Sequence, residues 1–216
     1  MTTPHLDRAS PLVFDPTTLT LLAITDDLRD GRDGLVARAA AAVRGGATMV
    51  QARLKDVDAR LYVEVVRSLV AALAVPVIVN DRADIAIAAG AAGVHVGADD
   101  VPASALRRLA PRGFIIGASV GCDAETDGAA GADYVGIGPL FETVSKGDAG
   151  AAIGIDAFAR LAARCALPAV AIGGVTEREA PAVMAAGAAG IAVIRAVFGS
   201  LDPEQAARAM RSAIGR

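Results

Sequence analysis

Two cations and an amide occupy every second position in one short segment of the chain. Gln51, Arg53 and Lys55 alternate with Ala52 and Leu54. Because side chains on a β-strand alternate between faces, the three polar residues are expected to share one face of a strand end. Burying two unpaired cations is costly, so the pattern predicts that an anion binds at this face. The alternative is a strand that runs out into a solvated loop.

Two aspartates follow the next two apolar runs and are the candidate metal ligands. Asp81 and Asp100 are expected near Arg53, Lys55 and Lys146. Carboxylates that face an anion repel it unless a cation lies between them, and Mg²⁺ prefers carboxylates combined with phosphate oxygens and water. The arrangement therefore predicts a diphosphate–Mg²⁺ site. The alternative role for either aspartate is a helix N-cap.

Groups that could transfer protons are scarce. His5 lies in the N-terminal segment, and His95 lies inside an apolar run, where hydrogen bonds within the protein are expected to hold it. No Cys or Ser is expected beside a plausible base. The predicted site therefore holds and withdraws charge rather than moving protons, which favours the departure of a phosphorylated leaving group.

These residues must be positioned by strands, and eight short apolar runs alternate with helical patterns along the chain. The runs cover residues 21–25, 48–50, 75–80, 93–97, 114–119, 133–138, 167–174 and 190–194. A Gly-Ala pair, a helix-end signal, precedes every second run, which indicates an internal repeat. Continuous apolar strands between helices are typical of a parallel sheet. The sequence predicts a (β/α)₈ TIM barrel, with a doubly wound open sheet as the alternative.

The barrel hypothesis makes a statement about the polar residues, because functional groups of this fold lie at the carboxyl ends of the strands. The candidates at strand ends are Gln51, Arg53, Lys55, Asn80, Asp81, Asp100, Ser119, Gly173, Gly174, Ile194 and Arg195, with Thr143, Ser145 and Lys146 in the loop after the sixth strand. Gly173-Gly174 after the seventh strand, with the end of the eighth, is the usual phosphate site of such barrels. The alternative is a tight turn that simply needs glycine.

Composition limits the remaining classes. The 216 residues are 54% apolar with a net charge of −3, and no basic block suggests nucleic acid. Every apolar stretch is interrupted well before the ~18 residues of a membrane span. Cys122 and Cys165 have no metal or redox spacing, so a reduced, cytoplasmic protein is expected. Residues 1–16 are predicted to be a loose lead-in and residues 17–216 one barrel domain. A homo-oligomer is compatible with the sequence, which leaves the oligomeric state open.

Taken together, the motifs resemble those of the thiamine-phosphate synthase family. The matching segments are 51–55 (Gln-Ala-Arg-Leu-Lys), 79–82 (Val-Asn-Asp-Arg), 93–97 with Asp100, 117–119 (Gly-Ala-Ser), 134–141, 143–146 (Thr-Val-Ser-Lys) and 171–175 (Ala-Ile-Gly-Gly-Val). The resemblance implies a transferase in which a hydroxymethylpyrimidine diphosphate loses pyrophosphate and a thiazole phosphate captures the resulting cation. It also implies Mg²⁺ and two small-molecule substrates.

The resemblance also implies residue roles. The pyrimidine diphosphate would be held by Gln51, Ala52, Arg53, Leu54, Lys55, Asn80, Ser119 and Lys146. The thiazole phosphate would be held by Thr143, Val144, Ser145, Gly173, Gly174, Ile194 and Arg195. Asp81 and Asp100 would bind Mg²⁺. Catalytic roles would fall to Arg53, Lys55, Ser119 and Lys146.

The sequence departs from the family pattern at Leu54, Gly121, Glu142 and Arg195, where Glu, His, Pro and Ser are usual. Two other functions therefore stay open. A thiazole tautomerase-like isomerase shares the fold, but its catalytic histidine after the fifth strand is missing here. A non-catalytic phosphate-binding barrel would keep Gly173-Gly174 and would have no use for paired aspartates.

Overall fold

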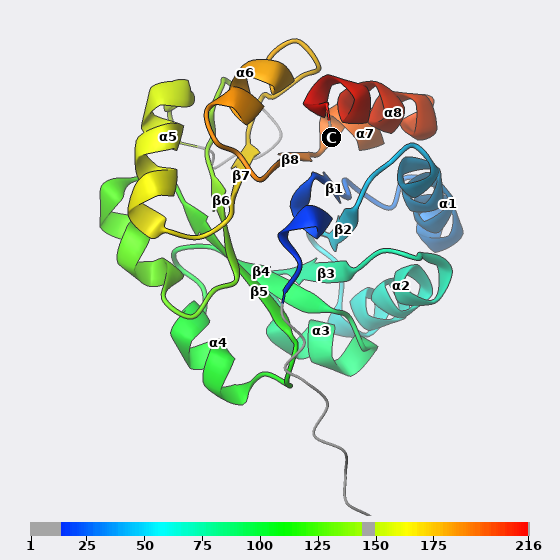
Figure 1. The fold of residues 1–216 in the computed structure, drawn as a ribbon. Coiled ribbons are helices and arrows are strands. Elements are labelled where there is room, and N and C mark those ends of the chain that lie inside the picture. Colours follow the sequence, from blue (N-terminus) through cyan, green and yellow to red (C-terminus); the bar gives the residue numbers. More distant parts are fainter. Residues whose placement is uncertain (1–13, 144–149, 216) are drawn as a thin grey trace, which may run out of the picture.

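A closed parallel β-barrel forms the centre of the molecule (Figure 1). The computed structural model describes residues 14–143 and 150–215. The strands are β1 (Leu21–Ile24), β2 (Met49–Ala52), β3 (Val77–Asn80), β4 (Gly93–Val96), β5 (Ile115–Val120), β6 (Tyr134–Ile137), β7 (Ala169–Ile172) and β8 (Gly190–Val193). Each strand pairs with the next, and β1 pairs with β8. The predicted (β/α)₈ barrel is therefore confirmed, and the open sheet is excluded.

Helical segments connect the strands and surround the barrel (Figure 1). They are α1 (Gly31–Arg44), α2 (Ala59–Ala72), α3 (Ala83–Ala89), α4 (Ala103–Leu109), the 3₁₀ segment η2 (Asp123–Ala129), α5 (Gly154–Cys165), α6 (Ala180–Ala185), α7 (Arg195–Phe198) and α8 (Pro203–Ile214). The sequence does not predict that the segment after β5 is 3₁₀. Among the described helices, none has both the length and the apolar character to cross a lipid bilayer.

Two apolar layers result from the alternation of side chains along each strand. One face of every strand packs against the helices, where Val50, Val79 and Val135 belong to a large buried cluster that contains many alanines. The other face fills the barrel interior with a smaller cluster that includes Met49 and Ile78. Strands that are buried on both faces read as continuous apolar runs, which is why the runs identified them.

The amino end of the barrel is closed by a short N-terminal segment. The 3₁₀ segment η1 (Pro16–Leu19) inserts Leu19 into the interior cluster. Phe14 stacks on Tyr134, with ring centroids 6.1 Å apart. Packed residues therefore begin on the N-terminal side of the predicted domain boundary at residue 17. That boundary stays a prediction, because residues 1–13 lie outside the described part.

Substitution of Gly190 by alanine is expected to lower the free energy of unfolding by about 1–3 kcal/mol or more, the usual cost of overpacking. A Cβ atom at this start of β8 would collide with the backbone carbonyl of Leu19, which has little room to move. Urea unfolding measures the loss. The matched control is Gly128→Ala in η2, where no atom lies within 4 Å of the added carbon. Equal stability of both variants would contradict the proposed closure of the barrel by η1.

Candidate active site

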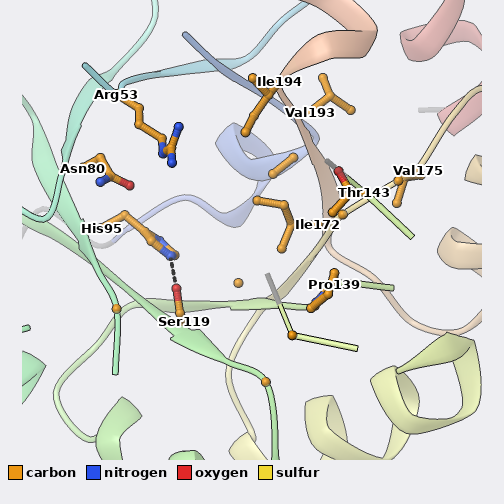
Figure 2. A pocket seen from close by; sticks show the side chains of 18 of the residues that line it. Arg53, Asn80, His95, Ser119, Pro139, Thr143, Ile172, Val175, Val193 and Ile194 are labelled. Carbon is orange, nitrogen blue, oxygen red and sulfur yellow. Dashed lines mark hydrogen bonds between the residues drawn. The ribbon is translucent and has the colours of Figure 1, made fainter. Parts of the chain in front are cut away.

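A large cavity of about 1410 Å³ lies at the carboxyl ends of the strands. Because all eight strands are parallel, the loops that follow them converge at this end. Figure 2 shows Arg53, Asn80 and His95 on one side of the cavity and Thr143, Val175 and Ile194 on the other. Members of both predicted substrate sets therefore face each other across one space.

The end of β2 follows the predicted alternation. Gln51 points into the barrel interior, where it lines a small cavity of about 20 Å³ and is 3% exposed. Arg53 comes next on the same face and is 8% exposed, with its guanidinium directed into the large cavity (Figure 2). The strand ends at Ala52, so Lys55 lies in the following loop as an exposed residue of the cavity rim.

The two apolar residues predicted in this segment, Leu54 and Ala52, differ in whether they reach the cavity. Leu54 lines the large cavity. Ala52 is fully buried between the barrel and the helices, and its side chain lies on the face opposite Gln51 and Arg53. The structure therefore does not bring the Ala52 side chain to the cavity, and the physical reason is the same period of two that brings Arg53 there.

Two residues that the motifs did not indicate hold this segment. The buried hydroxyl of Thr25 accepts a hydrogen bond from the Arg53 backbone N–H (2.8 Å) and donates one to the Arg53 carbonyl (3.1 Å). Tyr62 of α2 donates from its hydroxyl to the Ala52 carbonyl (2.7 Å). Burial raises the pKa of Tyr62 to about 12, so it stays a neutral donor at physiological pH. Hydrogen bonds from Thr25 on one side and Tyr62 on the other therefore fix the backbone from which the Arg53 side chain extends.

The ends of β3 and β4 bring both candidate metal ligands to the cavity. Asp81 and Asp100 line it together with Asn80. Asp81 has a φ of 62°, a left-handed conformation that non-glycine residues adopt infrequently, and its N–H donates to the His95 carbonyl (2.8 Å). One carboxylate oxygen of Asp100 accepts from the Gly97 N–H (2.7 Å).

Neither aspartate serves as a helix N-cap. The residue before α3 is Arg82, and the residue before α4 is Pro102. The alternative role that the sequence left open for Asp81 and Asp100 is therefore not observed. Both side chains line the cavity instead, where the Asp81 carboxylate accepts a hydrogen bond from the Asn80 side-chain amide (2.5 Å).

Ser119 of β5 lines the cavity. Its hydroxyl lies 3.0 Å from Nε2 of His95, whose Nδ1 lies 2.9 Å from the Tyr134 hydroxyl (Figure 2 draws the first contact). The expectation that hydrogen bonds inside the barrel hold His95 is confirmed. The expectation that no serine lies beside a base is wrong, because the pairing of β4 with β5 places Ser119 next to His95. Tyr134 was not predicted as part of the site, since it reads as an ordinary strand aromatic.

The opposite wall comes from the ends of β6, β7 and β8. Thr143, Gly173, Gly174, Ile194 and Arg195 all line the cavity. Gly173 and Gly174 have φ values of 95° and 68°, which glycine adopts without strain. An added Cβ would also lie 2.5 Å from Pro139 at Gly173 and 2.7 Å from the Glu142 carbonyl oxygen at Gly174. The tight turn alone requires this glycine pair, and its backbone is nevertheless exposed to the cavity.

The short helix α7 follows β8 directly, with its amino end at the cavity. Arg195 is its first residue and is exposed; among the described residues no carboxylate forms an ion pair with it. At the other end of α7, Arg29 donates to the Phe198 carbonyl (2.6 Å). A cation at a helix C-terminus is favourable, so this contact ties α7 to the loop after β1.

Three predicted residues, Val144, Ser145 and Lys146, lie outside the described part of the chain. Their roles stay predictions. One further cavity residue escaped the sequence motifs: Glu125 of η2, which accepts a hydrogen bond from the Gly121 N–H (2.6 Å). No local signal distinguishes it from a surface glutamate.

The fold and the site together define a class: a TIM barrel with a cavity, lined by charged and polar residues, at the carboxyl ends of its strands. A family model described as thiamine monophosphate synthase matches residues 21–197. The chain belongs to this family, and its enzymatic class is transferase.

Individual relatives agree. The chain is 44% identical to the thiamine-phosphate synthase of Roseiflexus castenholzii, over 93% of this chain and 90% of the relative. It is 48% identical to that of Methanoculleus marisnigri, over 83% and 86%. Among solved structures, the thiamine phosphate pyrophosphorylase from Pyrococcus furiosus superposes with a TM-score of 0.82 at 34% identity, covering 93% of this chain and 97% of that one.

Proposed function

We propose that this enzyme joins a hydroxymethylpyrimidine diphosphate to a thiazole phosphate and releases pyrophosphate, and that the two walls of the cavity divide the substrates between them. One observation carries the division: Arg53, Asn80 and Asp81 line one wall, and Gly174 and Arg195 line the other. A reaction between two anionic substrates needs two anion-binding regions that open into one space.

The wall formed by β2 to β5 suits the diphosphate. Arg53 is 8% exposed, and no carboxylate of the described residues forms an ion pair with its guanidinium. A poorly hydrated, unpaired cation is costly, and a bound diphosphate removes that cost. Lys55 at the rim adds a second charge, and the Asn80 amide adds a neutral contact. Lys146 is proposed to complete this set.

The two aspartates on this wall fit Mg²⁺. Within residues 14–143 and 150–215 no group of three or more His, Cys, Asp or Glu side chains could hold a metal ion. Asp81 and Asp100 therefore supply only two carboxylates, and diphosphate oxygens and water would complete the shell, as Mg²⁺ prefers with phosphorylated substrates. When bound, Mg²⁺ would neutralise charge on the departing diphosphate.

The wall formed by β6 to β8 suits the thiazole phosphate. Gly173, Gly174 and the first residue of α7 line the cavity, and backbone N–H groups at such positions would suit a phosphate. Arg195 adds a guanidinium that can bind phosphate through two parallel hydrogen bonds. Thr143 and Ile194 line the same wall, and Val144 and Ser145 are proposed to join it.

The reaction that these residues support needs no proton transfer at the reacting atoms. The bond between the pyrimidinylmethyl carbon and the diphosphate oxygen breaks, and the electron pair leaves with pyrophosphate. The lone pair of the thiazole nitrogen then forms the new carbon–nitrogen bond. Arg53 and Lys55 would stabilise the charge that grows on the leaving group, which is the electrostatic form of catalysis. The ring nitrogens of His95 are already engaged by Tyr134 and Ser119.

The direct test is product formation. Purified protein with both substrates and Mg²⁺ is expected to yield thiamine phosphate and one equivalent of pyrophosphate, measured by chromatography. Omission of either substrate, or addition of excess chelator, is expected to abolish the yield. Isomerisation of the thiazole phosphate alone would instead indicate a tautomerase-like isomerase, and binding without turnover would indicate a phosphate-binding barrel.

Substitution of Arg195 by serine is expected to raise KM for the thiazole phosphate about 10- to 150-fold with kcat little changed. The lost charge-assisted contact is worth about 1.5–3 kcal/mol and is remote from the reacting nitrogen, so ground state and transition state lose it equally. KM for the pyrimidine diphosphate should not change. Steady-state kinetics measures both constants.

The matched control is Arg112→Ser, which removes an exposed arginine from the loop between α4 and β5. That loop lies at the opposite end of the barrel, so neither KM should move. An unchanged KM for the thiazole phosphate in the Arg195 variant would show that its side chain does not contact the phosphate.

A further inference from the structure

A chain of three hydrogen-bonding side chains crosses the barrel interior and ends in the cavity. The Tyr134 hydroxyl contacts Nδ1 of His95 (2.9 Å), and Nε2 of His95 contacts the Ser119 hydroxyl (3.0 Å). Tyr134 is 1% exposed and His95 9% exposed, whereas Ser119 is half-buried and lines the cavity. Three strands, β4, β5 and β6, contribute one member each. The proposed reaction does not by itself explain the two buried members.

Two neighbouring glycines, which have no side chain, make room for the rings of Tyr134 and His95. A Cβ atom at Gly117 would collide with the rings of both Tyr134 and His95. A Cβ atom at Gly136 would lie 2.9 Å from Cε1 of His95, closer than real contacts allow. Both rings therefore pack directly against the backbone of β5 and β6, in space that a side chain at either glycine would fill. A closely packed, hydrogen-bonded ring can orient the group at its far end, as supporting residues do around metal and catalytic sites.

The direction of the hydrogen bonds follows from counting donors. Burial raises the pKa of the Tyr134 hydroxyl far above its usual value, so the hydroxyl keeps its proton. Among the described residues, His95 is the hydrogen-bonding partner of that hydroxyl. A buried donor without an acceptor is costly, so Tyr134 donates and Nδ1 of His95 accepts.

The positions of the protons on His95 and Ser119 then follow. A neutral imidazole that accepts at Nδ1 carries its proton at Nε2, and Nε2 therefore donates to the Ser119 oxygen. The Ser119 hydroxyl has accepted that bond, so its own proton is free to point toward the cavity. The arrangement also prevents His95 from taking a proton from Ser119, because Nε2 is already protonated.

We propose that Tyr134 and His95 are positioning residues that present the Ser119 hydroxyl to the cavity as a hydrogen-bond donor, facing an acceptor atom of the pyrimidine diphosphate. This inference rests on the proposed function. It assigns Ser119 the role of a donor and excludes the roles of nucleophile and proton acceptor. A pyrimidine ring nitrogen or a diphosphate oxygen satisfies such a donor, whereas an N–H group of a ligand does not.

The tautomer of His95 can be measured without substrate. The chain has two histidines, so protein labelled with ¹⁵N in the imidazole rings yields two sets of signals in a long-range ¹H–¹⁵N spectrum. A His5→Gln variant leaves only His95. The expected pattern is the neutral Nε2–H tautomer in the free enzyme. A predominant Nδ1–H tautomer, or an exchanging mixture, would overturn the proposal even if the enzyme forms thiamine phosphate normally.

A double-mutant cycle tests whether Tyr134 acts through Ser119. Tyr134→Phe is expected to lower kcat/KM for the pyrimidine diphosphate about 3- to 10-fold, the worth of one neutral hydrogen bond. In the Ser119→Ala background the same substitution should have little further effect, because residues of one network are not additive. The matched control uses the other tyrosine of the chain: Tyr62→Phe should act independently of Ser119→Ala, since it supports β2 instead.

The outcomes separate the two levels of inference. Independent, multiplicative losses for Tyr134→Phe and Ser119→Ala would overturn the positioning role. A parent enzyme that forms no thiamine phosphate would overturn the proposed function, while the His95 spectrum would still report the direction of the hydrogen bonds. Coupled losses together with the Nε2–H tautomer support the proposal.

Discussion

Replacement of Arg53 by glutamine is expected to lower kcat about 100-fold or more. Arg53 is the least exposed Lys or Arg among the described residues that line the cavity, and charge grows on the diphosphate as the carbon–oxygen bond breaks. Removal of one such preorganised group costs about 10²–10³ in kcat in other enzymes. Glutamine keeps much of the length and polarity, so the loss reports the charge.

The same substitution is not expected to lower the stability of the protein. In the free enzyme Arg53 is a buried cation without an ion pair among the described residues, so its removal should leave the free energy of unfolding unchanged or raise it. Urea unfolding and steady-state kinetics on one preparation measure both effects. Arg112→Gln, at the far end of the barrel, is the control. Undiminished turnover of the Arg53 variant would refute its role at the leaving group.

Asp81→Asn and Asp100→Asn are each expected to lower turnover by at least about tenfold, which corresponds to about 1.4 kcal/mol of barrier. Both substitutions keep the size of the side chain and remove the charge that attracts Mg²⁺. Each variant should also require more Mg²⁺ for half-maximal rate, because one of two protein carboxylates is lost. Asparagine tolerates the left-handed backbone of residue 81, so the fold should survive.

A Mg²⁺ titration of the initial rate provides the measurement. Asp127→Asn, an exposed aspartate of η2 outside the cavity, should leave both the rate and the Mg²⁺ requirement unchanged. The metal hypothesis fails if both cavity variants turn over at the parent rate, or if the parent enzyme works equally well in excess chelator.

The strands of the barrel could be predicted because each is a local apolar run that is buried on both faces. The run that precedes Gln51 and the alternation that follows it predicted the direction of Arg53 correctly, since the period of two is a property of the strand itself. The same rule places the Ala52 side chain on the opposite face, toward the helices, and its predicted contact with substrate stays a prediction. The 3₁₀ form of η2 after β5 had no comparable local signal.

What the sequence by itself determined is therefore the set of groups that can do chemistry and the end of the strands at which they lie. Only the tertiary structure decided which partners hold those groups. Thr25 forms hydrogen bonds with the backbone of Arg53, and His95 forms hydrogen bonds with both Tyr134 and Ser119. Each of these contacts joins residues on different strands or in the loops that directly follow them. Strand pairing and barrel closure set such contacts, and the periodicity of a single strand carries no information about its neighbour's register.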